Sequence, residues 1–291
     1  MDRRVRGALG TGALFLSVQL LALAVAPRLV AGGVSYGDGD DALVPLVLGL
    51  AVGTLLSLAA VRYRRSERLV RAVMLLSVGV ALWVAAAAFL GAVPGALAAA
   101  VGVAVAWRVQ RWEVRNLVAV VAVAGAAGLF GASLSPPYAL VALVLAAAYD
   151  AYAVYVSGHM ATMVDASARM GLPSAFVVPT GDGVPDGAVG TGGNGTTVAT
   201  LLGAGDALFP AILTASAAVE QAAGPGFGHA PSPVLGLPPS ALGALLGSFT
   251  GFVALQVLVQ RRGGMHAGLP FVNGGAVLGY LLAASIGPVP V

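Results

Sequence analysis

Long apolar stretches with almost no charge dominate this sequence of 291 residues. A helix needs about 20 apolar residues to cross the hydrocarbon core of a bilayer, which is about 30 Å thick. Nine stretches come close to or exceed that length, and they are continuous instead of alternating with period two, as the strands of a membrane barrel would. The sequence therefore predicts an all-α polytopic membrane protein with nine spanning helices. We expect these helices at residues 8–31, 43–61, 70–92, 94–107, 117–134, 138–158, 198–218, 238–260 and 265–287.

The composition excludes several classes of protein. Only 9% of the residues are charged, whereas a soluble domain carries about a quarter. A water-soluble domain, a disordered chain and a nucleic-acid-binding protein are therefore excluded. The chain has no Cys and only three His, which are far apart in the sequence. Because Cys and His are the usual ligands of zinc and iron–sulfur centres, we expect neither a metal site nor a cofactor.

The arginines predict the orientation of the chain in the membrane. Positively charged residues gather in cytoplasmic loops. If the N-terminus is cytoplasmic and there are nine spans, only Arg28 of the 15 basic residues falls on the outer side. The C-terminus is then outside. The alternative for the first span is a cleaved signal peptide, because arginines precede an apolar run that ends in small residues; cleavage would leave eight spans.

Two loops divide the predicted spans into three parts. Residues 1–158 form a six-helix N-terminal portion, and residues 198–291 form a three-helix C-terminal portion. Between them, residues 159–197 are polar and rich in glycine, which is typical of a flexible loop. This loop lies on the cytoplasmic side in the predicted orientation. It contains one apolar, β-prone patch at Phe176, Val177 and Val178.

Two carboxylates lie inside predicted spans. Asp150 is in the sixth span and Asp206 is in the seventh, and no other charge falls in the membrane interior. An acid at the bilayer centre costs about 2.5–3.5 kcal/mol on insertion scales, so such residues indicate function by default. Each Asp lies eight residues from the predicted cytoplasmic end of its span, or roughly 12 Å at 1.5 Å per residue. Adjacent antiparallel helices would therefore place the two carboxylates level with each other.

Two level carboxylates in a low dielectric cannot both ionise cheaply. They would share one proton, so that one is poised as a base and the other as an acid. Gly203 and Gly205 allow close approach of helices beside Asp206, and Tyr149 can donate a hydrogen bond beside Asp150. These residues are compatible with acid–base catalysis, with a cation- or proton-coupled transporter, and with a purely structural role. The transporter hypothesis predicts inverted repeats, yet spans one to five contain no interior charge.

The two Asp motifs resemble those of a known family. Tyr149-Asp150 and Gly203-Ala204-Gly205-Asp206 are similar to the YD and GxGD motifs of the presenilin and signal peptide peptidase family of intramembrane aspartyl proteases. The predicted topology resembles the presenilin arm, and the resemblance is nearest to the archaeal presenilin homologues. The family's PAL motif opens its ninth span. Here Ala267-Gly268-Leu269-Pro270 occupies that place, with Ala267 and Gly268 where the family has Pro and Ala.

This resemblance implies an aspartic endopeptidase that cleaves within transmembrane segments or signal-peptide remnants. Asp150 and Asp206 would activate water, and the residues around them would bind substrate. The implied substrate-binding residues are Gly268, Leu269, Pro270, Phe176, Val177 and Val178. The last three would pair with an unwound substrate, or else form an amphipathic segment on the bilayer surface.

The resemblance also bears on partners. Transmembrane peptides and the lipid bilayer are the expected partners, and the archaeal homologues imply activity without partner subunits. The sequence leaves open the physiological substrate, the cleavage-site preference and the oligomeric state. It also leaves open whether the loop at 159–197 is self-cleaved and which Asp carries the proton.

Overall fold

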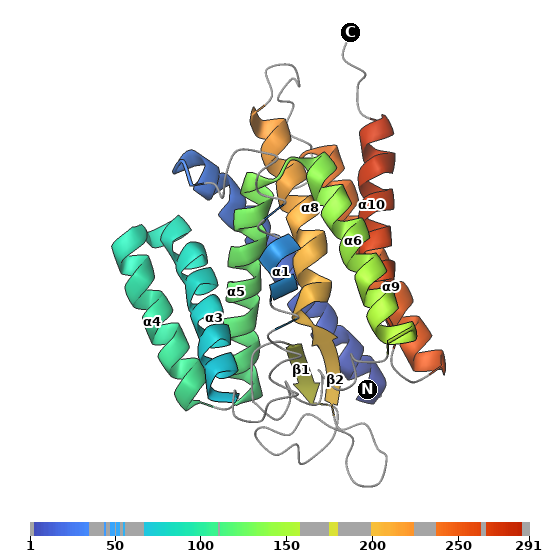
Figure 1. Cartoon of the computed structure of the whole chain (residues 1–291). Helices are drawn as coiled ribbons and strands as arrows, with labels where there is room; N and C mark the ends of the chain where they lie inside the picture. The colour runs from blue at the N-terminus through green and yellow to red at the C-terminus, as the bar shows by residue number, and fades with distance from the viewer. Residues whose placement is uncertain are drawn as a thin grey trace, which may run out of the picture.

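The computed structural model describes residues 3–34, 44, 47–49, 51–52, 55, 67–109, 111–157, 175–179, 199–223, 237–262 and 266–286. These residues form eight long helices and one two-stranded sheet (Figure 1). In chain order the elements are α1 (Arg3–Ala31), α3 (Glu67–Leu90), α4 (Ala92–Arg108), α5 (Trp112–Ser133), α6 (Pro136–Tyr155), β1 (Ala175–Pro179), β2 (Ala199–Gly203), α8 (Ala204–Ala223), α9 (Pro239–Arg262) and α10 (Leu269–Ile286).

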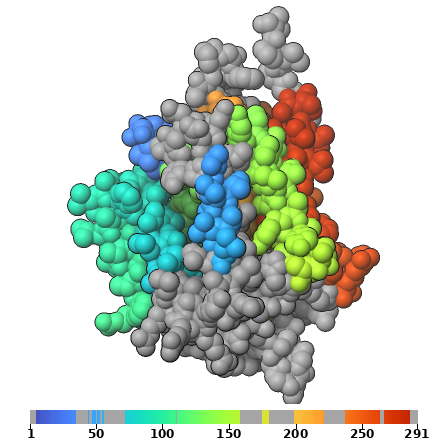
Figure 2. Space-filling model, in the orientation of Figure 1, coloured from blue at the N-terminus to red at the C-terminus, as the bar shows by residue number. Residues whose placement is uncertain are grey.

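Several of these helices are suited to crossing a membrane. Among the described residues, α1, α3, α5, α6 and α9 are long and apolar enough, and α4 and α10 are shorter apolar helices. In Figure 2, α3 and α4 form one flank of the molecule, and α6 and α10 form the other. Large apolar side chains are exposed on both flanks, including Leu97, Val101, Val144 and Leu278. Such surfaces are costly in water and natural in lipid, so this is an integral, multi-pass membrane protein. The predicted second span, 43–61, lies largely outside the described residues.

The prediction for the seventh span was wrong at its start. Residues 199–203 form strand β2 instead of the first turns of a helix, and α8 begins only at Ala204. Asp206 therefore lies in the first turn of α8. Asp150 lies five residues before α6 ends at Tyr155, not eight. The sequence could not show this because β2 exists through its antiparallel pairing with β1, which precedes it in the chain by some twenty residues.

The main hydrophobic core lies between α1, α5, α6, α8, α9 and α10. Phe15 of α1 is fully buried and stacks on Phe252 of α9, with 5.2 Å between ring centroids. Leu143 of α6, Ile212 of α8 and Val272 of α10 are also fully buried. Because α1 supplies part of this core, the predicted first span belongs to the folded protein as described.

Helices α9 and α10 pack unusually closely. Gly243, Gly247 and Gly251 recur every four residues on α9 and face Gly275 and Gly279 on α10. A Cβ added at Gly247 would collide with the carbonyl oxygen of Gly275. Small residues at this spacing let helix backbones approach within a bilayer, so this seam fixes α10 against α9.

The sheet lies at one end of the helices, against α1 and α5 (Figure 1). Its register pairs Phe176 with Leu202 and Val177 with Leu201. Phe176, Val177 and Val178 are all buried. The prediction of extended backbone at these residues is confirmed, but they do not form an amphipathic segment on the surface.

Candidate active site

The two aspartates that the sequence places in predicted spans lie where α6, α8 and α10 meet. Figure 1 shows β2 leading directly into α8, with α6 and α10 beside it. Asp150 on α6 is buried, with 4% of its surface exposed, and Asp206 on α8 is partly buried. Each side chain is positioned by a helix that the core fixes, and helix-borne sites are more precise than loop-borne ones.

Both carboxylates contact the residues that open α10. Asp150 Oδ2 accepts a hydrogen bond of 3.0 Å from the backbone N–H of Leu269. Asp206 lies against the preceding residue, because a Cβ added at Gly268 would be 2.8 Å from Asp206 Oδ1. The structure thus brings Asp150 and Asp206 to consecutive residues of the PAL-like segment. A helix N-terminus presents free N–H groups and a positive dipole end, which favour carboxylates.

The last residue of β2 holds the carboxylate of Asp206. The backbone N–H of Gly203 donates to Asp206 Oδ2 at 3.2 Å. A side chain at position 203 would begin 3.0 Å from the same oxygen, so glycine leaves room for this contact. At Gly205 an added Cβ would meet nothing within 4 Å, and nothing in the structure explains the glycine there.

The segment before α10 is tied to α6 at a second point. The N–H of Ala267 donates to the hydroxyl oxygen of Tyr155 at 3.3 Å, one turn beyond Asp150. Pro270 lies in the first turn of α10, where its missing N–H costs little. Tyr149, the other residue of the predicted site on α6, is partly buried.

Three residues outside the predicted set shape this region. Besides Tyr155, Asn273 of α10 donates from Nδ2 to the carbonyl of Leu143 on α6 at 2.9 Å. Asn116 of α5 bonds to the backbone of Val177 in β1. Both Asn side chains are buried carboxamides within apolar helices. Asn273 is visible in the sequence as a carboxamide within the expected span 265–287, whereas Asn116 lies just before the expected span 117–134 and gives no such signal.

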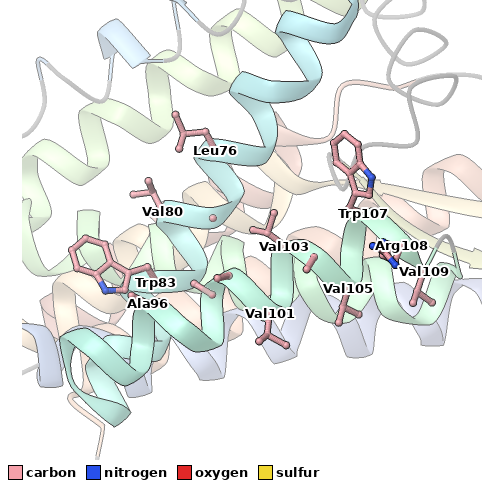
Figure 3. Close-up of a pocket in the computed structure, with 14 residues that line it drawn as sticks. Leu76, Val80, Trp83, Ala96, Val101, Val103, Val105, Trp107, Arg108 and Val109 are labelled. Carbon is pink, nitrogen blue, oxygen red and sulfur yellow. The ribbon is translucent and has the colours of Figure 1, made fainter.

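A metal site and a ligand-binding groove are two other kinds of site that the described part of the chain could contain. Those residues include no group of three His, Asp or Glu side chains that could hold a metal ion. A groove of about 930 Å³ runs between α3 and α4 (Figure 3). It is lined mostly by apolar and small side chains, with Trp83 toward one end and Trp107 and Arg108 toward the other. None of the predicted site residues lines it.

Comparison with known proteins gives the family. The family model described as "Signal-peptide peptidase, presenilin aspartyl protease" matches residues 12–288. The chain belongs to this family. Two solved structures of a presenilin family intramembrane aspartate protease, in the C222 and P2 space groups, are each 26% identical to the chain. Each alignment covers 96% of this chain and 98% of the solved one, with TM-scores of 0.64 and 0.65. No curated protein matches the chain.

Family and structural neighbours agree on the class of activity. The matched family consists of aspartyl proteases, and the solved relatives are intramembrane aspartate proteases. This presenilin-family chain is therefore an aspartic endopeptidase of the intramembrane-cleaving class.

Proposed function

We propose that this protein hydrolyses peptide bonds within transmembrane segments or signal-peptide remnants, with Asp150 and Asp206 as a water-activating pair. The observation that carries the proposal is the meeting of both carboxylates at Gly268 and Leu269. Two acids brought together inside a membrane protein cost free energy, so their presence there indicates a function. Enzymes use pairs of carboxylates in which one is ionised and the other is protonated.

The mechanism assigns one role to each protonation state. The ionised Asp removes a proton from a water molecule held between the pair, and the water oxygen attacks the scissile carbonyl carbon. The protonated Asp transfers its proton to the carbonyl oxygen, and a tetrahedral gem-diol forms. The proton taken from water then passes to the leaving nitrogen and the C–N bond breaks, while one hydroxyl of the gem-diol returns its proton to the other Asp and becomes the carbonyl of the new carboxyl group. This is general acid–base hydrolysis without a covalent intermediate.

The backbone contacts fix how the carboxylates face each other. Asp150 and Asp206 each accept a backbone N–H at Oδ2. We assign their Oδ1 atoms to water and substrate. Gly268, Leu269 and Pro270 shape the site around these atoms and hold substrate backbone. Carboxylates held by fixed dipoles need little reorganisation during reaction.

We assign substrate to the edge of β2, which pairs with no strand among the described residues. A helical substrate shields its peptide bonds, so the segment to be cut must unwind, and its freed backbone groups then need partners. Val177 directs its backbone groups away from β2, toward Asn116. The backbone N–H and C=O groups of Leu201, its register partner, therefore point to the opposite edge of the sheet. The backbone groups of the alternate residues Ala199 and Gly203 point the same way.

An extended substrate paired with this edge would run toward the carboxylates, because Gly203 contacts Asp206 directly. Strand addition of this kind supplies main-chain hydrogen bonds without demanding one sequence. We therefore assign substrate pairing to β2. This replaces the expectation that Phe176, Val177 and Val178 pair with the substrate, because β1 already pairs with β2 on one side and, at Val177, with Asn116 on the other.

The remaining expectations complete the proposal. We place the protein in the cell membrane with nine spans, a cytoplasmic N-terminus and an outer C-terminus. The helical portions 1–158 and 198–291 each contribute one carboxylate, and the loop at 159–197 joins them. We propose that the chain acts without partner subunits.

The test is cleavage of a fluorogenic transmembrane peptide by the purified protein. Asp150→Ala and Asp206→Ala should each lower the rate at least about a hundredfold, because each removes a proton-transfer group. A transition-state analogue with a hydroxyl in place of the scissile carbonyl should inhibit the unaltered protein. Glu113→Gln is the matched control, since Glu113 is an exposed acid paired only with Arg111 at 3.4 Å among the described residues.

Two outcomes would contradict the proposal. Cleavage that survives either Asp substitution would come from a contaminating protease. Proton flux into vesicles without cleavage of any of several peptides would instead support a transporter that uses the Asp pair as its ion site.

A further inference from the structure

Asn116, near the start of α5, is a buried side chain outside the catalytic chemistry. It is 3% exposed. Its Nδ2 donates to the carbonyl of Val177 at 2.7 Å, and its Oδ1 accepts from the N–H of Val177 at 2.9 Å. A carboxamide offers a donor and an acceptor, as a peptide group does. Asn116 therefore pairs with β1 as a neighbouring strand would.

This pairing closes one edge of the sheet. The residues of β1 that face away from β2 are Ala175, Val177 and Pro179, because alternate residues of an antiparallel strand face the same way. Asn116 satisfies both backbone groups of Val177, and Pro179 has no N–H to offer. An unpaired edge is where another chain adds to a sheet. With the edge of β1 occupied at Val177, the edge of β2 is the one that has no strand beside it within the described part of the chain.

The two hydrogen bonds between Asn116 and Val177 also fix the position of the sheet along the axis of α5. On its α1 side, β1 is confined by Gly10, where an added Cβ would lie 2.7 Å from Val178 Cγ1. Because packing against α1 restricts sideways movement of β1, the movement that remains possible is sliding along the helix axes. The bonds to Asn116 remove that freedom. Since β2 is in register with β1 and ends at Gly203, which contacts Asp206, the position of β1 is transmitted to the carboxylate.

We propose that Asn116 is a positioning residue that sets which peptide bond of the substrate reaches the Asp pair. This proposal rests on the proposed function, since it takes the substrate to be an extended strand on β2. Asn116 touches neither substrate nor the reacting atoms, and it acts through β1 and β2. A strand that slips by two residues keeps the same side chains on the same face. Loss of Asn116 therefore permits cleavage at bonds two residues from the normal one.

The test compares Asn116→Leu with Ser133→Ala. Leucine has the same number and branching of side-chain heavy atoms as asparagine but cannot form hydrogen bonds with Val177. Ser133 is a buried polar residue at the other end of α5, with a hydroxyl that donates to Leu129. Asn116→Leu should raise KM about tenfold, because the displaced sheet binds substrate more weakly, with a smaller fall in kcat. Mass spectrometry of the products should show new cuts two residues away, whereas Ser133→Ala should give the normal product.

A second variant and a second measurement guard against a folding defect. Asn116→Gln keeps the carboxamide on a longer side chain, so it should shift the ratio of products even where the leucine variant fails to fold. Amide hydrogen exchange in the peptide that contains Val177 should be faster in Asn116→Leu than in Ser133→Ala.

Each failure has a distinct meaning. If the Asn116 variants give the same products and the same KM as Ser133→Ala, the proposed role of Asn116 is wrong. The proposed protease function is then unaffected. If amide hydrogen exchange at Val177 is unchanged in Asn116→Leu, Asn116 does not protect the edge of β1, and the pairing on which the proposal depends is wrong. Absence of cleavage by the unaltered protein would overturn the proposed function, and substrate positioning with it.

Discussion

At the scale of single residues, the contact between Gly268 and Asp206 is the most constrained in the site. Any side chain at position 268 would begin 2.8 Å from Asp206 Oδ1, and the other oxygen of that carboxylate is held by Gly203. We expect Gly268→Val to lower kcat about a hundredfold, because displacement of a reacting group by about 1 Å has effects of that size. Gly268→Ala should lower kcat by a smaller factor, since the shift it forces is smaller. Steady-state cleavage kinetics of the purified variants measure both.

The control for this prediction is on the same helix. At Gly274 an added Cβ would meet nothing within 4 Å, so Gly274→Val should change kcat by no more than about threefold, as expected of a substitution away from packing and chemistry. If Gly268→Val and Gly274→Val lower kcat equally, the cause is a general intolerance of valine in α10. The contact between Gly268 and Asp206 would then not explain the loss of activity.

At the scale of elements, the glycine seam between α9 and α10 holds α10 in place, and α10 carries the residues that contact both carboxylates. Gly247→Val would force α9 away from the carbonyl of Gly275. Overpacking of this kind costs about 1–3 kcal/mol of unfolding free energy. Because α10 would shift as a unit, activity and thermal stability should fall together. A thermal melt in detergent beside a cleavage assay tests this.

Gly268→Val gives the contrast, since it should lower activity while the melting temperature stays close to that of the unaltered protein. A Gly247→Val protein that is fully active with a lowered melting temperature would show that α10 is positioned without the seam. The contacts from α6 to the start of α10, at Leu269 and Ala267, would then be the ones that position it.

The elements differ in how far the sequence could predict them. Helices such as α5 and α9 are found within a few residues of the expected spans, because a bilayer requires long, continuous apolar runs. Strand β2 was missed since its apolar residues continue into α8, and only pairing with β1 distinguishes them. The meeting of Asp150 and Asp206 followed from adjacent antiparallel spans. The contact of both with the start of α10 depends on packing between distant segments, which no local pattern encodes.

At the scale of the whole molecule, the orientation in the membrane decides from which side substrate reaches the sheet. Helix α4 has 17 residues, so its ends are roughly 25 Å apart at 1.5 Å per residue. In the orientation that the arginines predict, its start lies outside and its end, near Arg111, lies in the cytoplasm. The proposed catalytic carboxylates and the sheet would then belong to the cytoplasmic half, and substrate would be unwound from that side.

Single cysteines test this orientation cleanly, because the chain has no Cys of its own. Ala92 and Arg111 are both exposed and lie at opposite ends of α4. In intact cells, a membrane-impermeant maleimide should label Ala92→Cys at once and Arg111→Cys only after permeabilisation. Loss of Arg111 removes one exposed ion pair with Glu113, which contributes at most about 1 kcal/mol, so folding should be retained. The reverse pattern would put the Asp pair near the outer surface, and cleavage would then release the outer part of a substrate instead of its cytoplasmic part.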